Sequence, residues 1–219
     1  MIDKMVGKTE VALYGLAYSI GMLVQLFISG MNSALTPWMY SKIKKGDIRS
    51  MRKVLQLLSV VVVGIAVALM LISPELVLIF GSPKYREAVY VIPPVAASVF
   101  FIFIYNILSM PQFYYEKTQF LMAASMAAAG ANVVLNFIFI RLFGYIAAGY
   151  TTLACYMLYS VGHYIVSKRI LVNEGIQENL MSPGFLVACS AFLIGASIIC
   201  NLIFPYRILR YAILLASAG

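Results

Sequence analysis

Residues 54–72 read VLQLLSVVVVGIAVALMLI, an apolar run without a single charged side chain. A helix needs about 20 predominantly apolar residues to cross the roughly 30 Å hydrocarbon core of a bilayer. Five further stretches of similar character also lack Asp, Glu, Lys and Arg: 11–35, 88–110, 120–140, 146–167 and 185–204. Charge at mid-bilayer is costly, so confining the charged residues to the intervening segments predicts six membrane-spanning helices.

The overall composition supports an all-α membrane protein. Hydrophobic residues make up 63% of the 219 residues, charged residues 11%, and the mean hydropathy is +0.93. A soluble domain has about 45–50% apolar and about 25% charged residues, so the surplus apolar side chains must face lipid. We expect one transmembrane domain over residues 1–219, with spans at 11–40, 52–73, 88–110, 119–141, 146–167 and 184–204.

Both ends of the chain read as parts of further segments. The apolar run 212–219 is far too short to span a bilayer, so 207–219 is predicted to begin a truncated seventh helix. Residues 1–6 resemble the tail of a preceding segment. We therefore expect a bundle of six full helices plus a partial seventh, taken from a longer protein.

The net charge of +8 is concentrated in one short loop, 41–53, which carries Lys42, Lys44, Lys45, Arg49, Arg52 and Lys53 against Asp47. Basic loops stay on the cytoplasmic side of a membrane, so this loop is placed inside the cell. Alternation then places 111–118 and 168–182 inside and the other connections outside. A net positive charge gathered in such a loop is typical of a membrane protein, so no nucleic-acid partner is expected.

Prolines mark the longest outer connection, 73–87, and the segment after it. Within this connection the apolar stretch 76–80 is expected either to lie at the interface or to extend the preceding helix. Proline removes a backbone donor and clashes with the preceding turn, so Pro93 and Pro94 are predicted to bend or break the helix that contains them.

The sequence has no pattern typical of an enzyme. It contains no glycine-rich phosphate loop, no metal-ligand spacing and no Ser/His/Asp set, so no catalytic, cofactor or metal site is expected. Cys155, Cys189 and Cys200 fall inside predicted spans as small packing residues. The single histidine, His163, is either a packed, hydrogen-bonded residue near a membrane interface or a proton relay.

Neutral polar residues inside the spans are the candidates for a substrate path: Gln25, Asn32, Asn106, Asn132 and Asn136. Asn132 and Asn136 are four residues apart, so they share a helical face. That face either bonds to a neighbouring helix or lines a path for a hydroxyl-rich headgroup, and both interpretations stay open. The aromatic residues near span ends fit an interfacial belt.

Four stretches, in order, resemble the second half of a polysaccharide flippase. They are TEVALYGLAYSIGMLVQLFISGMNSALTPWMYSKIKKGDIRSMRK at 9–53, PELVLIFGSPKYREAVYVIPP at 74–94, GANVVLNFIFIRLFGYIAAGYTTLACY at 130–156, and Ser167-Lys168-Arg169. Such flippases belong to the multidrug/oligosaccharidyl-lipid/polysaccharide (MOP) exporter superfamily. In that family two lobes of six or seven helices enclose a central cavity, and this chain resembles the second lobe.

The resemblance implies translocation of an undecaprenyl-diphosphate-linked oligosaccharide across the bacterial cytoplasmic membrane, with loop 41–53 in the cytoplasm. The implied partners are membrane lipid, the lipid-linked oligosaccharide and the N-terminal lobe that this chain lacks. Where the cell-wall-precursor branch has an Ala-Asp-Arg-like run, this chain has Ala17-Tyr18-Ser19, which favours the general polysaccharide branch.

Two other functions remain open from the sequence. One is a multidrug or metabolite cation antiporter of the same superfamily, which usually needs an intramembrane carboxylate; the predicted spans contain none. The other is a non-transport membrane assembly protein.

Overall fold

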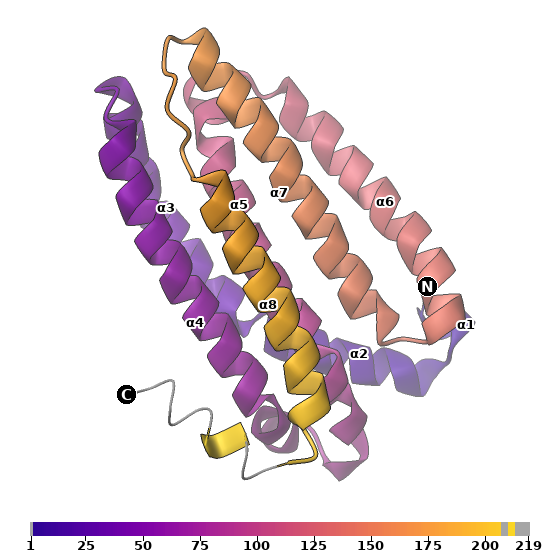
Figure 1. Ribbon diagram of the computed structural model, residues 1–219. Coiled ribbons are helices and arrows are strands. Elements are labelled where there is room, and N and C mark those ends of the chain that lie inside the picture. Colours follow the sequence, from indigo (N-terminus) through magenta and orange to yellow (C-terminus); the bar gives the residue numbers. More distant parts are fainter. Residues whose placement is uncertain (1, 207–209, 213–219) are drawn as a thin grey trace.

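The computed structural model describes residues 2–206 and 210–212, and within that part of the chain every regular element is helical (Figure 1). The predicted all-α class is confirmed. The elements are α1 Ile2–Met5, α2 Lys8–Gly21, α3 Leu23–Lys44, α4 Ile48–Phe80, the 3₁₀ helix η1 Pro83–Tyr90, α5 Ile92–Tyr114, α6 Gln119–Phe143, α7 Ala147–Asn173 and α8 Pro183–Ile203. The predicted partial helix 207–219 lies outside the described residues, except for 210–212.

Five helical stretches are long and apolar enough to cross a membrane: α2 with α3 as one stretch, α4, α5, α6 and α8. The sixth predicted span, 146–167, forms most of α7, a helix of 27 residues. By the same criterion α7 is not among the five, because polar residues such as Thr151, Thr152 and His163 lie along it among its apolar residues. The described chain is therefore a multi-pass membrane protein with five clear spans and α7 packed among them.

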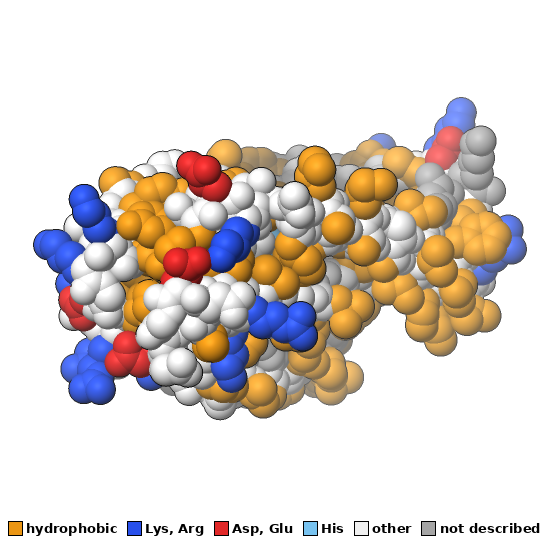
Figure 2. Space-filling model, turned by 90° about the horizontal axis from the view of Figure 1, so that it is seen from above, with side chains coloured by type: hydrophobic (Ala, Val, Ile, Leu, Met, Phe, Trp, Pro, Cys, Tyr) orange, Lys and Arg blue, Asp and Glu red, His pale blue; other side chains and the backbone are white. Residues whose placement is uncertain are grey.

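The long helices run side by side, and their connections alternate between the two ends of the bundle (Figure 1). Connections 45–47, 115–118 and 174–182 lie at one end, which we call the basic end, and connections 81–91 and 144–146 lie at the opposite end. Figure 2 views the basic end, where Lys, Arg, Asp and Glu side chains gather. The three loops predicted to share one side of the membrane thus lie together.

Helix α5 forms the centre of the bundle and α6 lies at its edge. Every residue from Val91 to Ile104 is buried, and α5 contacts α2, α3, α4, α7 and α8. In α6 only Ile140 is buried, and its long-helix neighbour is α7. Helix α6 is therefore the most exposed of the long helices, and two of the hollows described below lie beside it.

The predicted span 88–110 does break at its prolines: η1 ends at Tyr90, and a separate helix, α5, begins at Ile92. Helix α5 begins at Ile92, which puts Pro93 and Pro94 in its first turn. Backbone N–H groups in a first turn have no intrahelical partner, so proline there removes no hydrogen bond. Residues 76–80 extend the preceding helix: α4 continues through Pro74 to Phe80.

The first predicted stretch, 11–35, is not one continuous helix. It breaks at Met22 between α2 and α3, and Figure 1 shows α2 lying across the bundle while α3 runs along it. The break lies beside a close contact with α5, because a Cβ atom on Gly21 would come within 2.5 Å of Val95 Cγ1. The bend thus carries the backbone of α2 directly against the central helix.

Candidate functional site

A hollow of about 480 Å³ lies between α2, α5, α6 and α7, and we call it the tyrosine cavity. Five of its lining residues are tyrosines from three helices, and none of its described lining residues is charged. The lining comprises Tyr14, Tyr18, Tyr105, Ser125, Ala128, Ala129, Asn132, Thr152, Cys155, Tyr156 and Tyr159. The surface combines broad aromatic faces with hydroxyl and amide groups.

Helical spacing aligns the two tyrosines of α2, and helix packing aligns those of α5 and α7. Tyr14 and Tyr18 are one turn apart on α2, and their rings stack at 5.8 Å between centroids. Across the cavity, Tyr105 on α5 lies parallel to Tyr156 on α7 at 6.2 Å and tilted to Tyr159 at 4.7 Å. The Tyr159 hydroxyl and Ser125 Oγ are 2.9 Å apart, which joins α7 to α6. The rings are thus held in fixed orientations around a neutral space.

The two stacked asparagines of α6 lie on one face, as their spacing predicts. Asn136 Nδ2 donates to Asn132 Oδ1 at 2.8 Å, and Thr151 Oγ1 of α7 donates to Asn136 Oδ1 at 2.6 Å. Interhelical bonding is therefore realised in this face. Asn132 also lines the tyrosine cavity, and Asn136 lines an adjoining hollow of about 290 Å³ that shares Tyr14 with it.

The other three predicted path residues do not line the tyrosine cavity. Asn106 Nδ2 donates to Ile102 O within α5. Gln25 Oε1 and Asn32 Oδ1 of α3 are buried, with no hydrogen-bond partner among the described residues. Thr36 Oγ1 lies 3.8 Å from Met110 Sδ, so α3 runs along α5 near Asn106. The structure brings two of the five residues to the cavity, and a shared substrate path stays a prediction.

The tyrosines of the cavity were missed by the sequence analysis, which assigned aromatic residues to the membrane interface. Part of the available signal was position, because Tyr18, Tyr105 and Tyr156 lie inside the apolar stretches rather than at their ends. Their spacing at three and four residues on α2 and α7 is typical of one helical face. In the described part of the chain, no group of three His, Cys, Asp or Glu residues could hold a metal ion.

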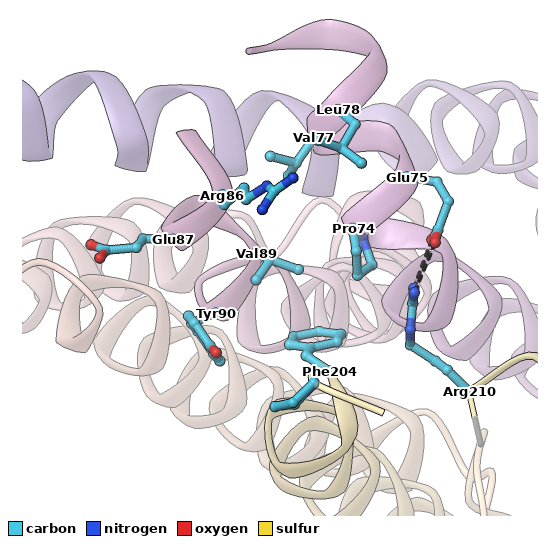
Figure 3. Close-up of a pocket in the computed structure, with 11 residues that line it drawn as sticks. Pro74, Glu75, Val77, Leu78, Arg86, Glu87, Val89, Tyr90, Phe204 and Arg210 are labelled. Carbon is cyan, nitrogen blue, oxygen red and sulfur yellow. Dashed lines mark hydrogen bonds and ion pairs between the residues drawn. The ribbon is translucent and has the colours of Figure 1, made fainter. Parts of the chain in front are cut away.

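A second hollow, of about 580 Å³, lies at the opposite end between α4, η1 and the chain after α8, and we call it the charged pocket (Figure 3). Arg210, which is 2% exposed, donates from Nη1 to Glu75 Oε2 at 2.7 Å and from Nη2 to Glu75 Oε1 at 2.8 Å. Arg210 also donates to Leu71 O, and the Tyr211 hydroxyl donates to Glu75 Oε1. The pair fastens the chain after α8 to α4.

The position of Glu75 differs from the sequence prediction, which placed it in a loop. It lies on α4, 27 residues after Ile48, which is about 40 Å along the helix at 1.5 Å per residue. A bilayer core is about 30 Å thick, so Glu75 sits near one end of the span rather than at its middle.

The MatE family profile matches residues 1–138. The chain belongs to the MatE family. Members of this family are transporters of the MOP superfamily rather than enzymes, so the superfamily resemblance is confirmed and the non-transport alternative loses its support. The matched residues include α2, α5 and most of α6, which form three of the four walls of the tyrosine cavity. Neither the curated proteins nor the solved structures gave a match.

Proposed function

We propose that this MatE transporter moves an undecaprenyl-diphosphate-linked oligosaccharide across the cytoplasmic membrane, acting as the second lobe of the transporter. The observation that carries the proposal is the neutral tyrosine cavity. Sugar rings present apolar C–H faces and many hydroxyl groups. The cavity offers aromatic faces for the former and, in Asn132, Ser125 and Thr152, hydrogen-bonding groups for the latter.

The distribution of carboxylates also supports a neutral sugar chain, rather than a cation, as the group that enters the tyrosine cavity. On helices α2 to α8 the carboxylates are Glu10, in the first turn of α2, and Glu75 of the charged pocket. Glu75 is already bonded to Arg210. A desolvated small cation would need a carboxylate or several oxygen ligands around it, and the lining of the tyrosine cavity has no carboxylate.

The tyrosine rings of the cavity also support a second candidate function. Tyrosine faces attract organic cations through their quadrupole, so a multidrug or metabolite cation antiporter remains the second candidate. It differs from the first in one requirement, because exchange for Na⁺ or H⁺ needs a site that binds the coupling ion.

The charge distribution supports a membrane orientation. The basic end carries loop 41–53 with its six Lys and Arg residues, and such loops are retained in the cytoplasm. We propose that the basic end faces the cytoplasm of a bacterial cell, that the charged pocket faces outward, and that an N-terminal lobe of the same transporter completes the cavity.

Binding to the protein in lipid nanodiscs tests the proposal directly. Fluorescent undecaprenyl-diphosphate oligosaccharide should bind, and Tyr156→Ala should weaken binding about tenfold, because one good stacking contact is worth about 1 kcal/mol or more. Tyr206→Ala is the matched control, since Tyr206 is exposed at the opposite end and lies outside the cavity. Binding of ethidium but not of the oligosaccharide lipid would replace this proposal with the antiporter.

A cellular assay extends the test to transport. Expression in a bacterial strain without its own polysaccharide flippase should restore surface polysaccharide, together with the N-terminal lobe if the chain alone does not suffice. Failure of both versions would contradict the flippase. Efflux of a cationic dye that follows a sodium or proton gradient would favour the second candidate.

A further inference from the structure

The single histidine of the chain lies behind the tyrosine cavity, fully buried between helices. His163 of α7 is 0% exposed, and its Nδ1 is 2.8 Å from Nε2 of Gln112 on α5, which is also 0% exposed. Gln112 Nε2 bonds to Leu108 O as well, at 3.3 Å. His163 Nε2 and Gln112 Oε1 are both buried without a partner among the described residues. Burying polar groups without hydrogen bonds costs free energy, so the His163–Gln112 pair needs a functional explanation.

The His163–Gln112 pair can form a hydrogen bond in either protonation state of the imidazole. With Gln112 Nε2 donating, Nδ1 accepts and the neutral ring carries its proton on Nε2. When Nδ1 takes up a proton, it becomes a donor, and the amide of Gln112 must turn so that Oε1 accepts. That turn moves Nε2 away from Leu108 O. The two states differ in the orientation of the Gln112 amide and in the bonds that Gln112 makes within α5.

Aromatic rings from three helices surround the imidazole. The ring centroids of Tyr159, Phe120 and Tyr105 lie 4.5, 5.5 and 5.8 Å from that of His163. At such distances an aromatic ring can attract a cation placed over its face. Together with Gln112, these rings form the surroundings of the imidazole, and we call them the aromatic cage.

No ionised side chain lies in the aromatic cage; its titratable groups are the phenols of Tyr105, from α5, and Tyr159, from α7 itself. Phe120, from α6, and Gln112 are uncharged at any pH. Two charged groups at this end have partners of their own: Lys117 pairs with Glu174 at 2.8 Å, and Arg52 Nε donates to Asn179 O at 2.7 Å. The surroundings of His163 therefore contain no carboxylate whose titration would mask its own.

The histidine is connected to the cavity and to a weak point in α5. Tyr105 and Tyr159 contact the imidazole and also line the tyrosine cavity. Gln112 follows Pro111, which has no backbone N–H to bond the carbonyl one turn earlier. The last turn of α5, ending at Tyr114, is thus held by fewer helical hydrogen bonds, and the side-chain bond of Gln112 contributes to its position.

We propose that His163 is a proton-binding site whose protonation turns the Gln112 amide, shifts the last turn of α5 and changes the affinity of the tyrosine cavity for its substrate. A proton from water forms an N–H bond at Nδ1, and the imidazole gains one positive charge. By linkage, substrate binding must change the proton affinity of His163 by the same factor. The existence of the proton site does not depend on the proposed function. Only the coupling between this site and the substrate affinity of the cavity rests on that function.

The sole histidine makes the protonation state directly measurable. The protein labelled with [¹⁵N]histidine in nanodiscs should show one imidazole that passes from a neutral ring with Nδ1 unprotonated to a doubly protonated ring between about pH 9 and about pH 4. Gln112→Leu should lower the proton affinity about three- to tenfold, because a charge-assisted bond is lost with the amide. Gln177→Leu, at an exposed loop position, is the matched control and should change nothing.

A second variant covers the case in which Gln112→Leu does not fold. Gln112→Glu places a carboxylate beside Nδ1 and should raise the proton affinity at least tenfold. An imidazole that keeps one protonation state across the titration, or midpoints that neither Gln112 variant moves, would overturn the proton site.

The coupling is tested separately from the site. Saturating oligosaccharide lipid should shift the titration midpoint in the wild-type protein, and His163→Gln should retain binding but lose its dependence on pH. If the histidine titrates and responds to Gln112→Leu but ignores the lipid, the proton site stands and the link to the proposed substrate fails.

Discussion

The charged pocket and the tyrosine cavity use opposite chemistry within one bundle. In the charged pocket Arg210 and Glu75 bind each other through two short hydrogen bonds, and Leu71 O and the Tyr211 hydroxyl complete the set. In the tyrosine cavity the lining is uncharged, and its hydroxyl and amide groups surround an open space of about 480 Å³. The first arrangement fastens two chain segments together, and the second surrounds an open space with neutral aromatic and polar groups.

The difference teaches where this protein can tolerate charge. A buried ion pair must satisfy both partners, because a single buried charge is strongly destabilising. Glu75 and Arg210 meet this condition near one end of α4. The tyrosine cavity, beside the edge helix α6, is lined by uncharged groups and therefore needs no paired charges. Four experiments would break or sharpen this contrast.

Removing one partner of the charged pocket should have the largest effect. Glu75→Ala leaves Arg210 buried and unpaired, so the free energy of unfolding should fall by about 3 kcal/mol. Chemical denaturation of the protein in detergent micelles measures this change. Glu87→Ala, an exposed carboxylate of the same pocket, should change stability by less than about 0.5 kcal/mol. Equal losses of unfolding free energy in the two variants would show that the ion pair does not stabilise the fold.

Placing a charge in the tyrosine cavity should shift its binding preference from the oligosaccharide lipid to an organic cation. Asn132→Asp puts a carboxylate among the tyrosine rings, so binding of an organic cation such as ethidium should strengthen about tenfold, a change of about 1.4 kcal/mol. Binding of the oligosaccharide lipid should weaken. Fluorescence titrations of both ligands in nanodiscs provide the measurement. Asn173→Asp, exposed at the end of α7, should alter neither affinity.

The bond between α6 and α7 should contribute a smaller amount. Thr151→Val and Asn136→Leu each remove the hydrogen bond that joins the two helices beside the cavity. A double-mutant cycle on unfolding should give a coupling energy of about 0.6 kcal/mol, the average for such bonds in membranes. A coupling near zero would mean that α6 is held by its apolar contacts alone.

The partly exposed pair at the basic end, Lys42 and Asp47, should have the smallest effect. Asp47 caps α4 by accepting from Ser50 N, and its hydrogen bond with Lys42 lowers its pKa below the ordinary value. A lowered folded-state pKa adds stability above the unfolded pKa and loses it as the pH falls through the folded value. The stability difference between wild type and Asp47→Ala should therefore be present at neutral pH and shrink in acid. A difference that grows in acid would contradict this assignment.

Much of the site depends on residues whose partners are distant in sequence. The spacing of Asn132 and Asn136 predicted their shared face, because helical geometry over one turn is local. Tyr105 and Tyr156 are separated by 50 residues, and their parallel rings depend on how α5 and α7 pack. The same holds for Glu75, whose partner Arg210 is 135 residues away. No local pattern indicates either pairing.

The sequence by itself determined the class of the protein. Apolar runs of membrane length, and the confinement of charge to the segments between them, follow from the cost of charge and unpaired backbone in lipid, which each segment meets on its own. Only the tertiary structure decided that α2 breaks from α3 at Met22, that Pro93 and Pro94 begin α5, and that α6 stands at the edge and leaves a cavity. These features depend on packing between helices, where a contact such as Gly21 against Val95 exists only once both helices are in place.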